Sequence, residues 1–241
     1  MTNQTETITE LVSRVADLVR NAYVPDSPTH DLSHLARVAA LSSKLCAMEG
    51  GSQLIVLCAA WLHDLHREVR GMSDAFFVSP EEMDDRATRI MDKACIPQAT
   101  YAQILDAIHY TDTFSFSDRS TYQTEVEAKI VRDADCLDAM GAIGIARAFS
   151  FGGSRGIPIW KESAFKHDST YRQSERPSST IQHFYDKLLR LGADLETRSA
   201  RKLGNERSEY LSDFVKQFMH EWGEDLDAVA GAGRWLEIGL A

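Results

Sequence analysis

The chain has 241 residues, 44% of them hydrophobic, which is enough to bury a hydrophobic core without a partner. Its 26 Lys and Arg residues stand against 36 Asp and Glu residues, and the formal net charge of -10 opposes sequence-independent binding to nucleic acid or to anionic lipid. A nucleic-acid scaffold role is therefore disfavoured, whereas a local basic pocket for a small phosphorylated ligand stays compatible with the composition.

The cysteines and the amino terminus indicate a reducing compartment. No two cysteines form a CxxC pair, and most lie in apolar stretches, so we interpret all four as buried free thiols: Cys46, Cys58, Cys95 and Cys136. The first ten residues lack the basic and apolar regions of a signal peptide, and no stretch approaches the roughly 18 apolar residues of a membrane span. We expect a cytoplasmic protein.

Hydrophobic spacing predicts helices along most of the chain and no convincing strand. Apolar residues recur at intervals of three and four over residues 8–19, which is typical of a helix with one buried face. A second helix is expected from near Asp31 to the glycine pair at 50–51. A third helix, from Leu54 to about His66, is apolar on almost every side and should lie in the middle of a bundle.

Capping residues and composition define the rest of the chain. Ser79, Pro80 and two glutamates give the N-cap, first turn and acidic start of another helix. Residues 111–123 read as a polar loop, and residues 151–179, rich in Gly, Pro and Ser, as a mobile binding loop or lid. The remaining helices are expected over residues 80–94, 98–110, 125–139, 181–191 and 205–222.

Three His-Asp dipeptides occur, and their contexts differ. His63-Asp64 ends the most apolar helix, where ionisable groups must be paired, neutralised or bound to a metal ion. Adjacent helical positions point about 100° apart, so both side chains can reach one ion from a helix end. The alternative is a His and an Asp that leave the core at a helix terminus.

Two other segments carry possible metal ligands. His30 and His34 lie four residues apart on one helical face, followed by Arg37, a spacing that suits a metal ion but also two solvated histidines. In the helix over residues 125–139, three aspartates stand among apolar residues and cannot all face the core: Asp133, Asp135 and Asp138. A buried one needs a cation, whereas the alternative places them on a polar face.

The ordered combination of these segments resembles the small bacterial single-domain members of the HD superfamily. It consists of HDxxHxxRV at residues 30–38, the apolar helix ending in His-Asp, and KIVRDADCLDAMGAIGIAR at residues 129–147. The two C-terminal helical segments are also similar to that group. The resemblance implies an all-α, single-domain HD-type bundle with a metal site in its centre. Its parts are an N-terminal helix (1–24), the HD domain with its mobile loop (25–222) and a C-terminal helical extension (223–241).

The resemblance implies a ligand set for one divalent cation: His34, His63, Asp64 and Asp135. Two imidazoles and two carboxylates leave open positions on a six-coordinate ion, which is typical of a catalytic site. Mn, Mg, Co, Zn, Ni and Fe all remain compatible with this set. Relatives often carry a helix with an AIxxHS pattern, whereas this chain reads AIHYTDTFS. Either His109 substitutes for the family's histidine or that role is absent, so the resemblance does not extend to a second metal ion or an extra acid-base group.

The implied activity is hydrolysis of a small phosphorylated molecule, in our first interpretation a nucleotide, by metal-activated water. The catalytic candidates are Asp64, which would bridge metal and water, and His66, Glu68 and Asp138, which could hold the water or move its proton. The substrate-binding candidates are His30, Arg37, His109, Arg155, Lys187 and Arg198. For most of these charged residues, an ordinary solvated helix face is the competing interpretation.

Other functions of the superfamily stay open. A di-iron oxygenase needs extra histidines, and none occurs between His66 and His109. A zinc hydratase or lyase and a non-catalytic nucleotide-binding protein are further alternatives. The apolar residues near the C-terminus could pack on a second copy, giving a homodimer, or back onto the bundle.

Overall fold

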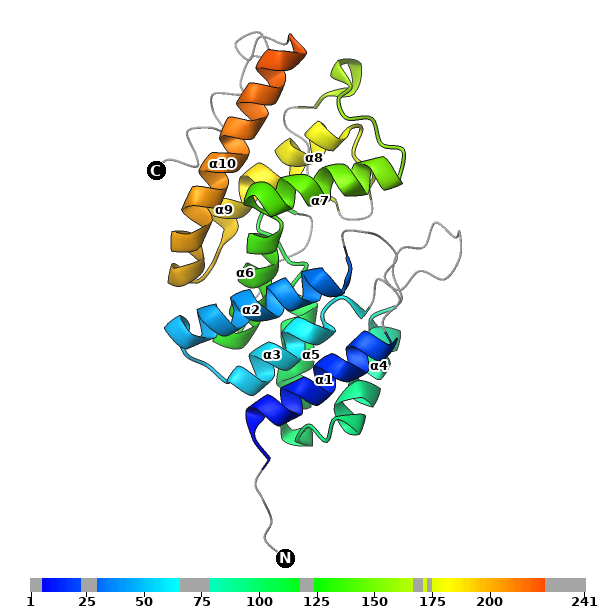
Figure 1. Ribbon diagram of the computed structural model, residues 1–241, viewed down its shortest axis with the longest axis vertical. Helices are drawn as coiled ribbons and strands as arrows, with labels where there is room; N and C mark the ends of the chain where they lie inside the picture. Colours follow the sequence, from blue (N-terminus) through cyan, green and yellow to red (C-terminus); the bar gives the residue numbers. More distant parts are fainter. Residues whose placement is uncertain are drawn as a thin grey trace, which may run out of the picture. The chain divides into compact units, whose positions relative to one another are not determined.

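The computed structural model describes residues 6–22, 30–65, 79–117, 124–166, 171–172 and 175–223 (Figure 1). All regular structure in these ranges is helical, which confirms the predicted all-α fold class. Within the same ranges, Ser117 and Tyr171 form an isolated parallel β-bridge. None of the described helices is both long enough and apolar enough to cross a membrane.

The chain packs as two compact units. The N-terminal unit consists of residues 1–112 and 123–134, and the C-terminal unit consists of residues 113–122 and 135–241. Helix α6 (Val126–Asp138) starts in the first unit and ends in the second. No sequence signal indicated this division, because the boundary falls inside a continuous helix and not in a linker.

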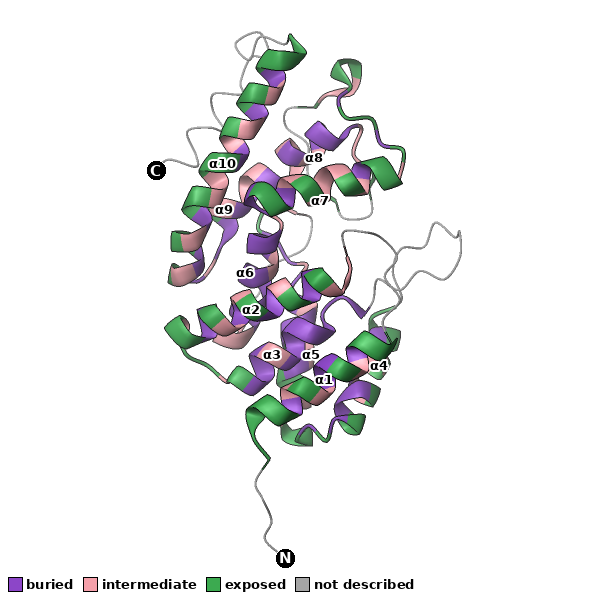
Figure 2. Cartoon of the chain, in the orientation of Figure 1, coloured by how far each residue is buried: buried purple, intermediate pink, exposed green. Residues whose placement is uncertain are grey.

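The N-terminal unit is organised around α3. Its complete helices are α1 (Ile8–Ala22), α2 (Leu32–Glu49), α3 (Gln53–Leu62), α4 (Pro80–Lys93) and α5 (Tyr101–Tyr110). Helix α3 packs against α1, α2 and α5, and nearly all its side chains are buried (Figure 2). The predicted central position of this helix is therefore confirmed. The helix ends at Leu62, four residues earlier than predicted, and residues 66–78 lie outside the described part.

Polar caps set where two of these helices begin. The Asp31 side chain accepts a hydrogen bond from the His34 backbone N–H, which starts α2. The Ser79 side chain accepts from the Glu82 backbone N–H, and Pro80 occupies the first turn of α4, as predicted.

Three of the four cysteines are buried, as the sequence predicts. Cys46, Cys58 and Cys136 are buried, and burial raises the pKa of Cys58 to about 12, so its thiol is unreactive at neutral pH. Cys95, in contrast, is exposed, and the prediction was wrong there. It follows the end of α4 with a φ of 58°, a turn conformation that directs the chain toward α5.

The C-terminal unit contains α7 (Gly141–Ser154), α8 (Thr180–Asp186), α9 (Leu191–Asp194) and α10 (Arg198–Trp222), together with the end of α6. Helix α10 begins seven residues before its predicted start, because the Thr197 side chain caps it by accepting from the Ala200 N–H. Helix α7 extends to Ser154, so the predicted loop over residues 151–179 begins as helix.

Much of the described part of that loop is tied to α8. The Thr180 backbone N–H donates to the Pro158 carbonyl at 2.8 Å. The Gln182 side chain makes two hydrogen bonds with the backbone of Lys166, at 2.9 and 2.8 Å. Trp160 is buried beside Phe165. These contacts hold residues 157–166 against α8.

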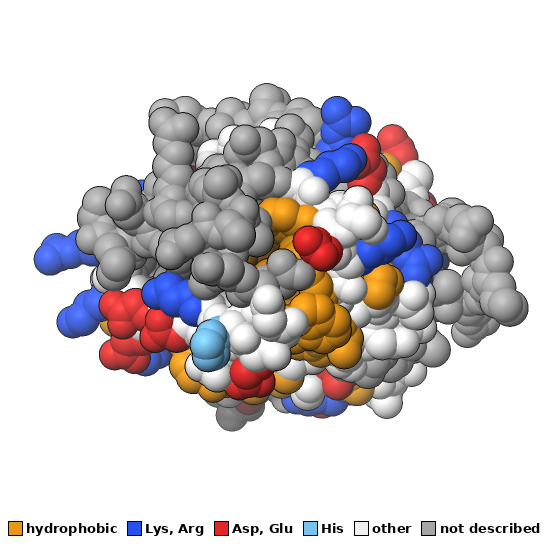
Figure 3. Space-filling view, turned by 90° about the horizontal axis from the view of Figure 1, so that it is seen from above, with side chains coloured by type: hydrophobic (Ala, Val, Ile, Leu, Met, Phe, Trp, Pro, Cys, Tyr) orange, Lys and Arg blue, Asp and Glu red, His pale blue; other side chains and the backbone are white. Residues whose placement is uncertain are grey.

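An aromatic series connects α7, α8 and α10. Ring centroids 5.4–6.3 Å apart link its members: Phe149, Phe184, Phe214, Phe218 and Trp222. Phe184 is buried, whereas Trp222 is half exposed. Figure 3, viewed from above, shows a band of hydrophobic side chains at the surface between charged ones. Helix α10 thus has a buried part, made by Leu211, Val215 and Met219, and an aromatic edge near solvent.

The close approach at Gly144 gives a stability prediction. A Cβ atom at this position in α7 would lie 2.1 Å from the Ala139 carbonyl oxygen, a backbone atom that cannot rotate away. Gly144→Ala should therefore lower the free energy of unfolding by roughly 1–3 kcal/mol, as overpacked sites do. Urea denaturation monitored by circular dichroism measures this change.

Gly153 is the matched control in the same helix, since a Cβ atom there meets nothing within 4 Å. Gly153→Ala should stabilise the chain by about 0.5–1 kcal/mol, through helix propensity alone. Equal stabilisation by both substitutions would contradict the packing described at Gly144.

Candidate metal centre

His63 and Asp64 follow the last residue of α3 directly. Because α3 lies among α1, α2 and α5, the residues that follow it are still inside the N-terminal unit. Both side chains are nearly completely buried, Asp64 with 2% of its surface exposed. A carboxylate in such a place is costly without hydrogen bonds or a cation.

His30 and His34 flank the first turn of α2. Asp31, between them, is the N-cap residue, and it also accepts a hydrogen bond from the Ser33 hydroxyl at 2.7 Å. Burial favours the neutral form of Asp31, but hydrogen bonds from Ser33 and from the His34 N–H outweigh burial, so the pKa of Asp31 lies below its ordinary value. The charged cap therefore persists at neutral pH and fixes the backbone that carries both histidines.

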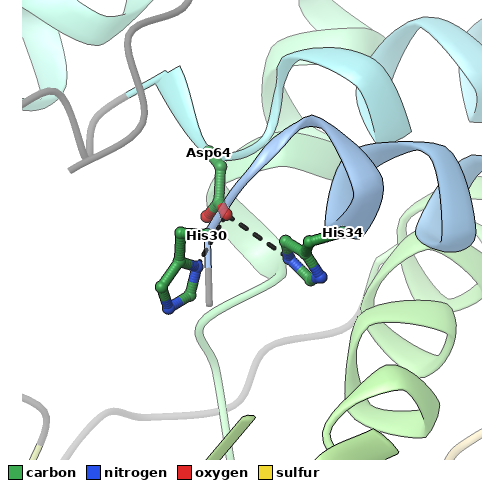
Figure 4. A group of neighbouring side chains, drawn as sticks. All are labelled: His30, His34 and Asp64. Atoms are coloured by element: carbon green, nitrogen blue, oxygen red, sulfur yellow. Dashed lines mark hydrogen bonds and ion pairs between the residues drawn. The ribbon is translucent and has the colours of Figure 1, made fainter. Parts of the chain in front are cut away.

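The two segments meet at the Asp64 carboxylate (Figure 4). His30 Nδ1 lies 2.8 Å from Asp64 Oδ2, and His34 Nε2 lies 3.4 Å from the same oxygen. The other oxygen, Oδ1, lies 3.8 Å from His63 Nε2. The His34 ring is 5.4 Å from the ring of His30 and 5.4 Å from that of His63, centroid to centroid. Three imidazoles thus surround one buried carboxylate.

A backbone hydrogen bond selects the tautomer of His63. Its Nδ1 lies 2.9 Å from the carbonyl oxygen of Ala60, and a carbonyl oxygen can only accept a hydrogen bond. Nδ1 therefore carries the proton, and in the neutral ring the lone pair is on Nε2, the nitrogen nearest Asp64. This arrangement, with one nitrogen held by a carbonyl and the other available, is common for metal-binding histidines.

The donor chemistry fits a divalent metal ion. His30, His34 and Asp64 each offer one ligand atom, and these atoms all lie within 4.8 Å of one another. Imidazole nitrogen together with carboxylate oxygen suits first-row transition ions. A His/Asp cluster consistent with a metal site is therefore present in the N-terminal unit, and it includes His30, for which the sequence indicated only a supporting or substrate-facing role.

Two of the three α6 aspartates are buried against arginines. The carboxylate of Asp133 pairs with Arg132 at 3.2 Å, and both side chains are buried in the N-terminal unit. In the C-terminal unit, Asp138 accepts a hydrogen bond from Arg147 at 2.9 Å. The sequence allows a metal ion as the cation for these carboxylates, whereas the structure gives each of these two an arginine partner, Arg132 or Arg147. Asp135 is half-buried on the part of α6 that belongs to the C-terminal unit.

Two predicted substrate residues in the N-terminal unit have local partners. Arg37 donates to the Ser33 hydroxyl at 2.9 Å, along its own helix. His109, on α5, lies 2.8 Å from the carboxylate of Asp84 on α4, apart from the cluster around Asp64. The catalytic candidates His66 and Glu68 lie outside the described residues.

Comparison with known proteins identifies the family. The family model for the HD domain matches residues 31–140. The YpgQ protein of Bacillus subtilis is 32% identical over 202 residues, which make up 83% of this chain and 87% of YpgQ. The chain belongs to the HD superfamily. The recognition made from the sequence is thereby confirmed.

Similar solved structures support this family assignment. A protein of Lactobacillus plantarum matches with a TM-score of 0.76 and 30% identity, over 92% of this chain and all of that one. YpgQ in complex with ADP matches with a TM-score of 0.67 and 27% identity, over 90% of this chain and 97% of YpgQ. An HD-superfamily hydrolase of Bacillus thuringiensis matches with a TM-score of 0.62 and 27% identity, over 90% and 97% of the two chains. The family match and the hydrolase of Bacillus thuringiensis indicate a metal-dependent hydrolase.

The HD chain carries its other predicted cationic residues in the C-terminal unit. Lys187 Nζ lies 4.6 Å from the centre of the Phe114 ring and 5.2 Å from that of Tyr171, so two aromatic faces hold the ammonium. The Arg155 guanidinium lies over Phe151, and Arg198 is exposed in the first turn of α10. Two aromatic rings thus fix the ammonium of Lys187.

His183, one turn before Lys187, gives a pH prediction. Burial, with a smaller effect of the Lys187 charge, lowers the pKa of His183 to about 3, so the folded chain keeps this ring neutral. An unfolded histidine has a pKa of about 6.5, so below that pH the unfolded chain binds the extra proton and is favoured. Stability from this residue is therefore complete above about pH 6.5 and is lost progressively as the pH falls toward 3.

His183→Gln removes this titration. Between pH 6.5 and 4, the wild type should lose up to about 1.4 kcal/mol of unfolding free energy per pH unit more than the variant loses. Urea denaturation at a series of pH values measures both slopes. Identical slopes would show that His183 is protonated in the folded chain as readily as in the unfolded one.

Proposed function

We propose that the chain is a metal-dependent phosphohydrolase that acts on a nucleotide. The observation that carries the proposal is the set of imidazoles around the buried Asp64 carboxylate, which lies within the residues that match the HD family model. The nucleotide class is supported by the relative YpgQ, whose structure is a complex with ADP.

In this proposal, the metal ion is held by His34, His63, Asp64 and Asp135. All four lie within the residues that match the HD family model. A divalent cation bound there would lower the pKa of a water molecule and stabilise negative charge on a phosphoryl oxygen. Asp135 enters this set through the family resemblance and its position on α6.

The chain's own residues orient the site and limit access to water. The His34 side chain is fully buried and Asp64 is almost so, whereas the His30 side chain is 19% exposed. Substrate would therefore approach the cluster from the side of His30. The Asp64 oxygens face different histidines, Oδ2 toward His30 and His34 and Oδ1 toward His63, which fixes the plane of the carboxylate. A carboxylate held in this way can orient a water molecule and accept its proton.

In this proposal, Lys187 binds substrate, whereas Asp138 has a structural role. Lys187, with its ammonium held over two aromatic rings, supplies a positive charge for a phosphate group. Asp138, considered from the sequence as a base, is given no catalytic role here, because its carboxylate binds Arg147 and so joins the end of α6 to α7.

Asp64→Asn tests the proposal. We would purify the full chain without chelator, determine bound metals by elemental analysis, and measure phosphate and pyrophosphate release from nucleoside mono-, di- and triphosphates with Mn, Mg, Co, Zn or Fe. The wild type should release product only with metal. Asp64→Asn should reduce the rate at least about a hundredfold, as loss of a positioned acid-base group does.

Asp84→Asn is the matched control, since Asp84 also lies 2.8 Å from a histidine nitrogen in the N-terminal unit but belongs to no group of three ligand atoms among the described residues. Its rate should equal that of the wild type. Nucleotide-induced thermal stabilisation without product under any metal would instead indicate a binding protein. About two irons per chain without phosphate release would indicate oxygenase chemistry.

A further inference from the structure

We propose that His30 is an additional ligand of the metal ion, bound through Nδ1 beside His34 and Asp64. The inference rests on the metal site of the proposed function and extends it. The ligand set taken from the family resemblance contains two histidines, His34 and His63, and assigns His30 only a supporting place.

The distances around Asp64 Oδ2 carry the inference. Metal–nitrogen and metal–oxygen bonds of about 2.1 Å place neighbouring ligands of one six-coordinate ion about 3 Å apart. His30 Nδ1 lies 2.8 Å and His34 Nε2 3.4 Å from this oxygen, values on either side of that separation. All three atoms lie within 4.8 Å of one another, and the two rings approach the carboxylate from two sides (Figure 4).

A hydrogen bond alone would explain the 2.8 Å distance between His30 and Asp64, but not the presence of a third ligand atom beside them. His109 Nε2 lies at the same 2.8 Å from Asp84, and that pair has no third ligand atom close enough to form a group among the described residues. His30, in contrast, meets its carboxylate at the point where a second imidazole also converges. Convergence of three donors is what a metal ion requires.

The local backbone prepares His30 for this role. His30 directly precedes the N-cap residue Asp31, whose side chain is bound to the His34 N–H at 2.8 Å. The same cap therefore fixes both histidines at the start of α2. Because the donors are already placed by the backbone, little ordering is needed when the ion binds.

Binding through Nδ1 requires a change of tautomer and no net loss of a proton. Without the ion, the Nδ1–H of a neutral His30 donates to Asp64 Oδ2. With the ion, the lone pair of Nδ1 is needed, so the proton moves to Nε2 of the same ring. The partly exposed side chain allows solvent water to carry this proton.

An additional imidazole also predicts which metals bind best. Mg²⁺ prefers oxygen ligands and keeps several waters, whereas Mn²⁺, Fe²⁺, Co²⁺, Ni²⁺ and Zn²⁺ accept imidazole readily. An additional imidazole ligand should therefore strengthen the preference of the site for a first-row transition ion over Mg²⁺.

His30→Gln separates ligation from hydrogen bonding, because the Gln amide can still donate to Asp64 but offers no imidazole. We would titrate the metal-free full chain with Mn²⁺ and with Mg²⁺ by calorimetry, and count nitrogen ligands in the Cu²⁺ form by electron paramagnetic resonance. The variant should lose one nitrogen ligand. Its affinity for Mn²⁺ should fall at least about tenfold, and its affinity for Mg²⁺ should fall less.

Two further variants complete the test. His220→Gln removes an exposed histidine of α10 and should leave the nitrogen count and both affinities unchanged. His30→Ala should regain the missing nitrogen signal when free imidazole is added. An unchanged nitrogen count in His30→Gln, or a wild-type chain that binds no metal, would overturn the inference. A wild type that binds metal but releases no phosphate would refute the proposed function while leaving the ligand count of His30 valid.

Discussion

The burial of a carboxylate at the end of an apolar helix is the constraint on which the site depends. Helix α3 packs with almost every side chain buried, and Asp64 follows it without a polar segment in between. Such a group destabilises the fold unless polar partners surround it. His30 forms a hydrogen bond with this carboxylate, and the nearest ring nitrogens of His34 and His63 lie 3.4 and 3.8 Å from it. The same surroundings that make Asp64 tolerable also create a set of metal donors.

Precise placement of these groups comes from backbone hydrogen bonds more than from the side chains themselves. The cap at Asp31 fixes the start of α2, and the Ala60 carbonyl fixes the ring of His63. Neither contact involves a metal ion, so the cluster is formed by ordinary helix chemistry. A site built in this way needs no reorganisation of secondary structure to bind a cation.

The sequence predicted the helices and the HD cluster well, because both leave local signals. Apolar periodicity and capping residues located α2, α3 and α4, and the position of His63-Asp64 after an apolar helix predicted their burial. The long-range contacts left no such signal. The pairing of Asp138 with Arg147 depends on how α6 meets α7, and the contact of Lys187 with Phe114 depends on a distant loop. The start of α10 was missed because Gly204 and Asn205 resemble a helix boundary, although Thr197 provides the actual cap.

Helix α6 separates the proposed metal ligands from the cationic residues proposed to bind substrate. It crosses from one unit to the other without a linker, and the family match ends at residue 140, two residues after the helix does. All the proposed metal ligands, from His30 to Asp135, therefore precede that point, whereas Arg155, Lys187 and Arg198 follow it. Substitutions after Met140 can therefore change the residues proposed to bind phosphate without replacing any proposed metal ligand. The two units cannot be separated at a linker, because their boundary falls inside the continuous helix α6.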